Sequence, residues 1–171
     1  AVKLTNYLSK FLKGVHLHVL GEVSDMITES LNGICTDKIT LHGKVDPDRL
    51  VDYYSSADIM LSMSMFDPCP NVVVEGLACG LPVITPEESG ASELVENPLW
   101  IVKEDMPLKY YELQTIEAIP EVNLEKYKDV ILEVFQNLGD NKRIARNRAV
   151  NHLDINLISE KYINFFQSLE K

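Results

Sequence analysis

The feature that most constrains the fold is a regular alternation of short apolar runs with amphipathic segments over the first hundred or so residues. The runs contain many β-branched residues and end near turn-forming residues, which is typical of buried strands. Because helical segments separate the runs, the sequence predicts an α/β fold, a doubly wound parallel sheet with right-handed crossovers and helices on both faces. The predicted strands are Val15–Leu20, Lys38–Val45, Asp58–Met65, Leu81–Thr85 and Leu99–Val102.

Helices are predicted where apolar residues recur every three or four positions. In the sheet region they are Val2–Lys13, a segment with Met26, Ile27 and Leu31 on one face, a helix starting at Asp46-Pro47, Asn71–Cys79 and Ala91–Glu96. Three more are expected at 124–138, 142–152 and 157–169, the first ending at Gly139 and the last lying across the sheet. We therefore expect one domain, residues 1–171, with C-terminal helices from about residue 121 packed on it.

The segment Asn71–Cys79 is ambiguous by propensity, because three consecutive valines favour a strand. Its ends favour a helix. Asn71 is a suitable N-cap, Gly80 is a suitable residue just past the C-terminus, and Pro82 follows the stop. The interpretation adopted is a short helix that begins at the mouth of the sheet.

Composition excludes several classes of protein. The formal net charge of −10 argues against nonspecific binding to nucleic acid or to an anionic membrane, since both need a basic face. No apolar run approaches the roughly 18 residues of a transmembrane helix, and no secretory signal is visible. Cys35, Cys69 and Cys79 lack the spacing of a disulfide framework or zinc site, which favours a reducing cytoplasm. Because Ala1 is not an initiator methionine, we expect the chain to begin inside a larger protein.

Two carboxylates, Asp67 and Glu75, lie eight positions apart around the turn that opens the helix at Asn71. Ligands of doubly wound sheets sit outside the carboxyl ends of the strands, where this turn is expected. Both carboxylates and the free N–H groups near Asn71, Val72 and Val73 should face that space, which suits a ligand with hydroxyls and phosphate. Two simpler readings stay open: Asp67 as a turn residue before Pro68, and Glu75 as an acid favoured by the helix dipole.

Other reactive side chains are weaker candidates. Cys69 has no histidine nearby in sequence to activate it as a nucleophile. His16 and His18 alternate along a strand, but two ligands do not make a metal site, and a structural or exposed role is expected for them. His42, which precedes Gly43, is the histidine that merits a test.

From about Leu4 to Val102, and more loosely to the C-terminus, the sequence resembles a retaining glycosyltransferase of family four, with the GT-B fold. The strongest match runs from Ala57 to Gly90 and centres on the string CPNVVVEGLACGLPV at residues 69–83. The resemblance implies that this chain is the C-terminal, Rossmann-like half, which binds a nucleotide-sugar donor. It implies no bound metal and no cofactor.

The resemblance also implies roles for individual positions. Glu75 would bind the ribose hydroxyls and Asp67 the donor sugar, and these two are the candidate catalytic residues. Backbone groups elsewhere would contact the sugar, the diphosphate and the base, and the positions concerned are Gly21, Val45, Cys69, Pro70, Asn71, Val72 and Gly90.

The sequence departs from the family pattern in two ways. Asp67 replaces a glutamate and is one methylene shorter, which sets its carboxylate back by about 1.5 Å. The first strand of this half, with its Gly-Arg loop and following lysine, is not present in the sequence.

The resemblance implies transfer of a sugar, with retention, from a nucleotide-diphosphate donor to an acceptor glycan or lipid-linked saccharide held by the absent N-terminal half. This chain alone would be inactive. The resemblance also implies a role in polysaccharide biosynthesis. It implies a cytoplasmic protein that is peripheral at the membrane through parts outside this sequence. Two alternatives stay open: a noncatalytic GT-B-like scaffold or partner-binding module, and the donor half of a nucleotide-sugar epimerase. A receiver-type signalling domain would need an acid cluster and a late lysine that the sequence lacks.

Overall fold

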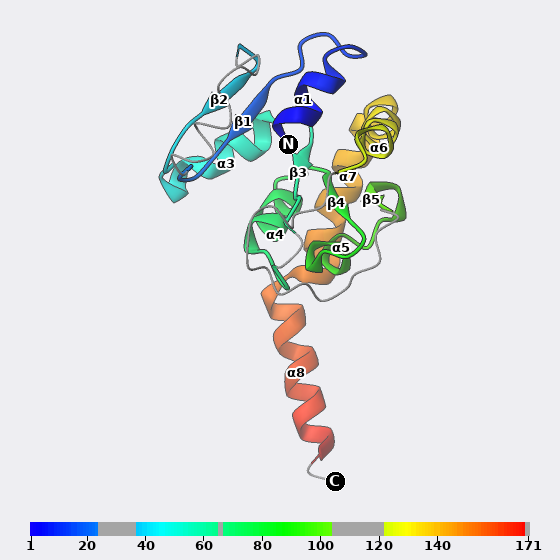
Figure 1. Cartoon of the computed structure of the whole chain (residues 1–171). Helices are drawn as coiled ribbons and strands as arrows, with labels where there is room; N and C mark the ends of the chain where they lie inside the picture. Colours follow the sequence, from blue (N-terminus) through cyan, green and yellow to red (C-terminus); the bar gives the residue numbers. More distant parts are fainter. Residues whose placement is uncertain (24–36, 65–66, 104–121, 170–171) are drawn as a thin grey trace, which may run out of the picture.

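The computed structural model describes residues 1–23, 37–64, 67–103 and 122–169, and Figure 1 shows their arrangement. Several predictions fall outside these residues. They are the helix with Met26, Ile27 and Leu31, the end of the third strand at Met65, and the segment 104–120 without a clear strand.

The described strands form two parallel sheets, which confirms the predicted α/β class. In the first, β1 (Leu17–Val19) pairs with β2 (Ile39–Leu41). In the second, β4 (Val83–Pro86) lies between β3 (Met60–Leu61) and β5 (Ile101–Val102). Each of the five strands among the described residues is shorter than the apolar run that predicted it.

Glycine explains where the first sheet ends. Gly21 and Gly43 have φ angles of 109° and 65°, a region that favours glycine, and the N–H of Gly21 donates to the carbonyl of Gly43 at 2.8 Å. The two residues form an antiparallel bridge beyond the parallel ladder. The ladder itself ends at Val19 and Leu41, before these glycines.

The first helix, α1 (Val2–Leu8), ends five residues before the predicted Lys13. The Ser9 hydroxyl donates to the carbonyl of Asn6 at 2.9 Å, and the N–H groups of Phe11 and Leu12 both donate to the carbonyl of Leu8. Side-chain bonds of this kind compete with helix propagation, so the chain continues as turns.

Helix α3 (Pro47–Ser56) begins as predicted. Asp46 is the N-cap, its Oδ1 accepts from the N–H of Asp48 at 3.0 Å, and Pro47 takes the first helical position.

Helix α4 (Asn71–Ala78) confirms the helical interpretation but corrects its start. Pro70, in extended geometry, is the N-cap, and its carbonyl accepts from the N–H of Val73 at 3.0 Å. Asn71 is already helical, so the prediction that its side chain caps the helix is wrong.

The C-terminus of α4 follows the prediction. Gly80 has a φ of 75°, and the N–H groups of Gly80 and Leu81 donate back to Leu77 and Gly76, both at 2.9 Å. This is the Schellman arrangement that glycine favours. Val73 and Leu77, one turn apart, are fully buried, and this burial decides for helix over strand.

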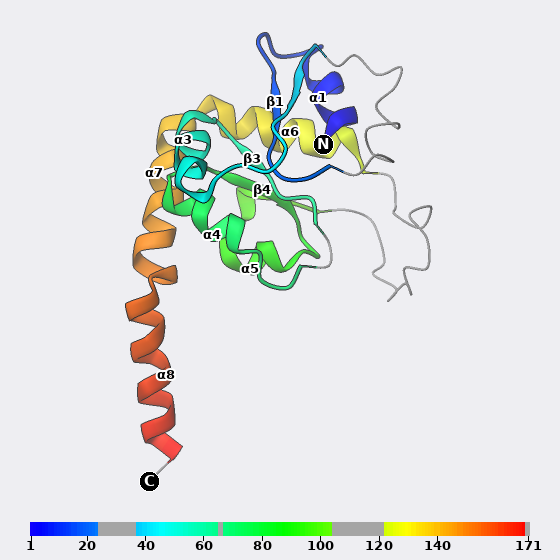
Figure 2. The same cartoon turned by 90° about the vertical axis from the view of Figure 1, so that its left-hand side faces the viewer.

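The core lies between the second sheet and the helices around it. Helices α4 and α5 (Gly90–Val95) pack side by side near β4 (Figures 1 and 2), and α6 (Leu124–Gln136) packs on β5 and on the 3₁₀ turn Pro98–Trp100. The indole N–H of Trp100 donates to Asn141 Oδ1 at 2.9 Å, and Asn141 Nδ2 donates to the carbonyls of Val134 and Asn137. These partners satisfy the buried amide of Asn141.

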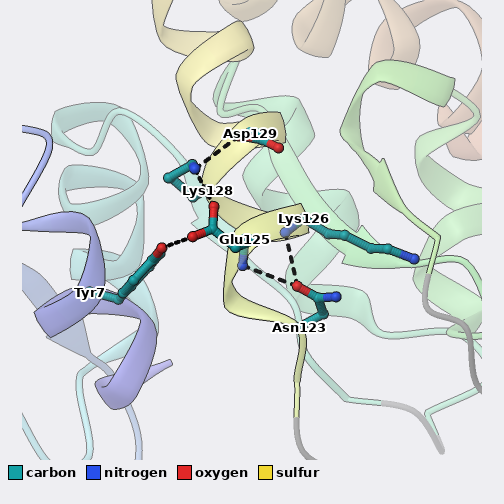
Figure 3. Close-up of polar contacts among 6 residues, drawn as sticks. All are labelled: Tyr7, Asn123, Glu125, Lys126, Lys128 and Asp129. Atoms are coloured by element: carbon teal, nitrogen blue, oxygen red, sulfur yellow. Dashed lines mark hydrogen bonds and ion pairs between the residues drawn. The ribbon is translucent and has the colours of Figure 1, made fainter.

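Helices α1 and α6 are joined by a polar cluster at the N-terminus of α6 (Figure 3). Glu125 accepts from the Tyr7 hydroxyl and from the Lys128 ammonium. Asn123 caps α6 by accepting from the N–H groups of Glu125 and Lys126 at 3.2 and 3.3 Å. The hydrogen bond with Glu125 raises the pKa of Tyr7.

The C-terminal helices correct two predicted boundaries. The chain turns at Asn137, and Gly139 is the second residue of α7 (Leu138–Arg148), not the end of α6. A π-helical turn, Ala149–Leu153, follows α7 and replaces the helix predicted up to His152.

Helix α7 holds the C-terminal ends of α3, α4 and α5. Lys142 Nζ donates to the carbonyl of Ala57 at 2.9 Å, Arg146 donates to that of Ala78, and Arg148 Nε donates to that of Leu94 at 2.8 Å. Cations are favourable at helix C-termini, where carbonyls lack partners. Three side chains of one helix thus fix three helices that follow successive strands.

The last helix, α8 (Ile155–Leu169), projects away from the rest of the chain (Figures 1 and 2). It has no buried residue, and Tyr162, Phe165 and Phe166 are each more than half exposed. The prediction that it lies across the sheet is wrong. In the described part of the chain, no helix combines the length and the apolarity needed to cross a membrane.

Candidate functional site

The predicted site residues all follow the carboxyl ends of strands. Gly21 follows β1, Val45 follows β2, the turn from Asp67 to Pro70 follows β3, and Gly90 follows β4. Glu75 lies on the second turn of α4 and is exposed to solvent. This edge is the one at which doubly wound folds bind their ligands.

Asp67 closes the turn before α4. Its Oδ1 accepts from the N–H of Cys69 at 3.1 Å, and both residues are exposed, whereas Pro70 is buried. The turn role for Asp67 is therefore present in the structure. Cys69 is a free thiol at the surface of this turn.

Gly90 is the point at which the Asp67 turn meets the next loop. A Cβ at Gly90 would lie 2.2 Å from the carbonyl oxygen of Pro68 and 2.7 Å from that of Asp67. Ser89 fixes the same junction, because its hydroxyl donates to the carbonyl of Ser64 at 2.6 Å and accepts from the N–H of Ala91. The loops after β3 and β4 thus pack backbone against backbone.

The Glu75 carboxylate accepts a hydrogen bond from Tyr54, a residue that the sequence predicts on the inward face of α3. The Tyr54 hydroxyl donates to Glu75 Oε2 at 3.1 Å, and the Tyr54 side chain is only 8% exposed. Burial, with the hydrogen bond and negative charge of Glu75, raises the pKa of Tyr54 to about 12. The hydroxyl therefore stays protonated and orients one carboxylate oxygen of Glu75. No hydrogen bond between described residues joins Glu75 to Asp67.

The structure places Gly21 and Gly43 in contact and leaves Val45 half-buried just beyond them. His42 hydrogen-bonds on both sides: its Nε2 lies 2.9 Å from His18 Nδ1, and its Nδ1 lies 3.2 Å from the Tyr53 hydroxyl. Burial, followed by the charges of His16 and His42, lowers the pKa of His18.

His16 lies against His18 and 2.8 Å from the Thr40 hydroxyl. Where the structure describes the chain, no three His, Cys, Asp or Glu side chains are placed to hold a metal ion.

Sequence reasoning missed three residues at this edge. Tyr54 belongs to an apolar helix face by its spacing, and the spacing alone does not show that its hydroxyl reaches Glu75. Ser89 precedes a helix start, which is a recognisable cap signal. Glu88 is half-buried and follows β4. In the sequence, the pair Glu87-Glu88 after a strand does not indicate which of the two acids is buried.

A surface hollow of about 400 Å³ lies elsewhere. It is lined by residues between Ser9 and His16 and by Lys38, which precede β1 and β2. It includes none of the predicted site residues, so we do not assign it to the candidate site.

Parallel strands, covering helices and polar residues at the strand ends define the class as a Rossmann-like domain of the GT-B type. The structure of Anabaena HepE in complex with UDP and glucose aligns with a TM-score of 0.70 at 17% identity, over 96% of this chain and 44% of HepE. A glycosyltransferase from Rickettsia africae aligns with a TM-score of 0.71 at 20% identity, over 99% of this chain and 44% of its own.

The family follows from the sequence. Residues 3–112 match the family described as group 1 glycosyl transferases, and this chain belongs to that family. ORF31 of a virus (isolate Australia/Victoria), whose name describes a glycosyltransferase, is 30% identical over 117 residues, which are 66% of this chain and 32% of ORF31. The chain thus spans about a third of the length of this relative.

Proposed function

We propose that this chain is the donor-binding, C-terminal half of a retaining family-four glycosyltransferase. Its ligand is a nucleotide-diphosphate sugar that lies across the carboxyl ends of the strands. The observation that carries the proposal is the exposed Glu75 carboxylate, which a buried tyrosine orients at 3.1 Å beside the turn that follows β3. The complex of HepE with UDP and glucose supports a donor of this chemistry.

Each predicted residue has a role in this proposal. Glu75 accepts hydrogen bonds from the ribose hydroxyls through the oxygen that Tyr54 leaves free. Asp67 orients the sugar, and backbone N–H groups at Asn71 and Val72 share the phosphates with the positive end of the α4 dipole. Backbone near Gly21 and Val45 borders the base.

The chemistry rests on charge stabilisation. The diphosphate leaves with its electron pair while positive charge develops on the sugar, and fixed dipoles and acids favour that separation. Retention places the acceptor on the face from which the diphosphate departs. The acceptor, a glycan or a lipid-linked saccharide, would be bound by the other half of the protein, so this chain alone is inactive. The proposed role is in polysaccharide biosynthesis. The proposed location is the cytoplasm, at the periphery of the membrane through parts beyond this chain.

The arrangement of the strands supports the domain assignment. In the doubly wound order 3-2-1-4-5-6, two strands precede the first strand in space and three follow it. The described strands form one group of two, β2-β1, and one of three, β3-β4-β5. This grouping matches the two strands and the three strands that flank the first strand in that order.

A second candidate function is a noncatalytic module that retains this fold. The bond between Asp67 and Cys69 favours it, because a turn role accounts for Asp67 without a substrate. Replacing Asp67 with asparagine in the intact protein separates the two, since the asparagine oxygen can still close the turn. A scaffold keeps its full function with this change, whereas a transferase loses sugar transfer.

Calorimetric titration of this chain with nucleoside diphosphates tests the proposal. We expect weak binding that Glu75→Ala reduces by about tenfold, because the carboxylate makes charge-assisted hydrogen bonds to the ribose. Glu133→Ala, an exposed acid on α6, is the control and should bind as the unmodified chain does. Equal affinities for the Glu75→Ala variant and the unmodified chain would remove Glu75 from the site.

A further inference from the structure

The surface hollow of about 400 Å³ lies at the amino ends of β1 and β2, away from the predicted donor residues at the carboxyl ends. It is lined by the chain between α1 and β1 (Figure 1) and by Lys38, which directly precedes β2. The N–H of Leu17 donates to the carbonyl of Lys38 at 2.8 Å, which joins the two parts of the lining. Small-molecule sites have volumes of about 300–1,000 Å³, so a ligand of that kind fits here.

The hollow is lined by cations in a chain that is acidic overall. The chain has 26 Asp and Glu against 16 Lys and Arg, yet the lining includes Lys13, Lys38 and His16 and no carboxylate from the described residues. Asp37 precedes Lys38 in the chain but does not line the hollow. Both lysines are exposed, and neither forms an ion pair within the described ranges. Two ammonium groups without an acid partner favour an anion.

The less exposed part of the lining is apolar. Leu12 and Val15 are partly buried and pack against the hydrophobic core. Gly14 lies between them with a φ of 75°, a conformation that favours glycine, and a Cβ at this position would meet no atom within 4 Å. The hollow therefore offers apolar surface beside its cations.

The polar side chains of the lining differ in what they can donate. His16 Nε2 lies 2.8 Å from the Thr40 hydroxyl, and this contact leaves Nδ1 of the ring for a ligand. The Ser9 hydroxyl already donates to the carbonyl of Asn6 at 2.9 Å. The donors for an anion are thus the two lysines and His16, with Ser9 excluded.

We propose that this hollow binds a small, soluble phosphate ester with an apolar portion. The phosphate pairs with the ammonium groups of Lys13 and Lys38 and accepts from His16, and the apolar portion covers Leu12 and Val15. Lysine is a common partner of phosphate, and a dianion gains from two cations. A small ester suits the hollow better than an anionic membrane does, because the chain as a whole is negatively charged and such a surface would repel it. The site is independent of the donor-binding function.

Calorimetric titration with phenyl phosphate, inorganic phosphate and phenol at low salt tests the proposal. Phenyl phosphate has both halves of the expected ligand, and the other two probes have one half each. We expect phenyl phosphate to bind about tenfold more tightly than inorganic phosphate, because its ring covers apolar surface. Phenol should not bind measurably. No binding of phenyl phosphate to the unmodified chain would overturn the proposal.

Lysine variants identify the site. Lys13→Gln and Lys38→Gln should each weaken phenyl phosphate binding by about tenfold, whereas Lys161→Gln, an exposed lysine on α8, is the matched control and should have no effect. Because both lining lysines are exposed, the variants should keep the melting temperature of the unmodified chain. Unchanged affinity in both variants would remove the lysines from the site and overturn the proposal.

A map of backbone amide shifts in the unmodified chain locates the probe without any substitution. We expect the largest shifts from phenyl phosphate at Leu12, Gly14 and Lys38. Shifts at Asn71 and Val72 alone would show that phosphate binds at the start of α4, which would overturn the hollow and leave the donor site standing. Sedimentation with phosphatidylglycerol vesicles tests the membrane alternative: lysine-dependent binding to vesicles without binding of phenyl phosphate would also overturn the proposal.

Discussion

Replacing Tyr54 with phenylalanine tests the contact that orients Glu75. Burial and the neighbouring Glu75 raise the pKa of Tyr54 from 10.0 to about 12. Below about pH 10 this residue is protonated in the folded and the unfolded chain, and its contribution to stability is fully present. Between about pH 10 and pH 12 the unfolded chain loses the proton while the folded chain keeps it, so stability falls as the pH rises.

The size of this loss follows from the two pKa values. Each tenfold change in acid dissociation corresponds to about 1.4 kcal/mol, so the loss due to Tyr54 reaches at most about 2.7 kcal/mol at high pH. Burial of Tyr54 contributes more to this rise in pKa than the hydrogen bond with Glu75 does. Because the Glu75 carboxylate is exposed to water, we assign about 1 kcal/mol to the hydrogen bond itself. Tyr54→Phe should therefore cost about 1 kcal/mol at neutral pH.

Urea unfolding at a series of pH values from about 8 to 11 measures both effects. The difference in unfolding free energy between the unmodified chain and Tyr54→Phe should shrink as the pH rises. The ionisation of Tyr7 occurs in both proteins and cancels in this difference. A difference that stays constant over the whole range would refute the assigned pKa and the buried hydrogen bond with it.

Three further predictions concern the elements around the site. Gly90→Ala should destabilise the chain by about 1–3 kcal/mol in denaturant unfolding, because the added Cβ would lie 2.2 Å from the Pro68 oxygen; an unchanged midpoint would contradict the packing of the two loops. Arg146→Ala should cost about 1 kcal/mol in the same assay through the uncapped end of α4, whereas Arg143→Ala, which breaks an exposed pair with Asp140, should cost less than about 0.5 kcal/mol. Because the pKa of His18 is lowered in the folded chain, the unfolded chain binds the His18 proton first as the pH falls, and stability should fall below about pH 6.5. His18→Asn should weaken this pH dependence of stability. An identical acid profile for the variant would exclude His18 as its source.

Local patterns were sufficient to predict the fold class and several element ends. The Asp46-Pro47 start of α3 and the Gly80 stop of α4 both depend on capping within a few residues, and both are confirmed. Helix ends at which two neighbouring residues can each take the cap position were predicted poorly. The sequence predicts that Asn71 caps α4, but Pro70, whose φ and ψ are extended, takes that position. It also predicts a stop at Gly139, although α7 includes this residue.

The candidate site shows the same division. Residues placed by a turn or a strand end, such as Gly21 and Gly90, lie where the sequence predicted, because their positions follow from local geometry. The contact between Tyr54 and Glu75 joins residues 21 positions apart on two helices, and no pattern in the sequence encodes it. The sequence also does not show that α8 projects from the domain. Whether a helix packs on the sheet depends on which surfaces the other helices already cover in the folded chain.

A map of backbone amide shifts in this chain during titration with UDP-glucose tests directly whether the donor binds at the carboxyl ends of the strands. We expect the largest shifts at Gly21, Val45, Asn71, Val72 and Glu75, and we expect Glu75→Ala to weaken all of them. Shifts confined to the opposite edge, around the hollow between Ser9 and His16, would contradict it.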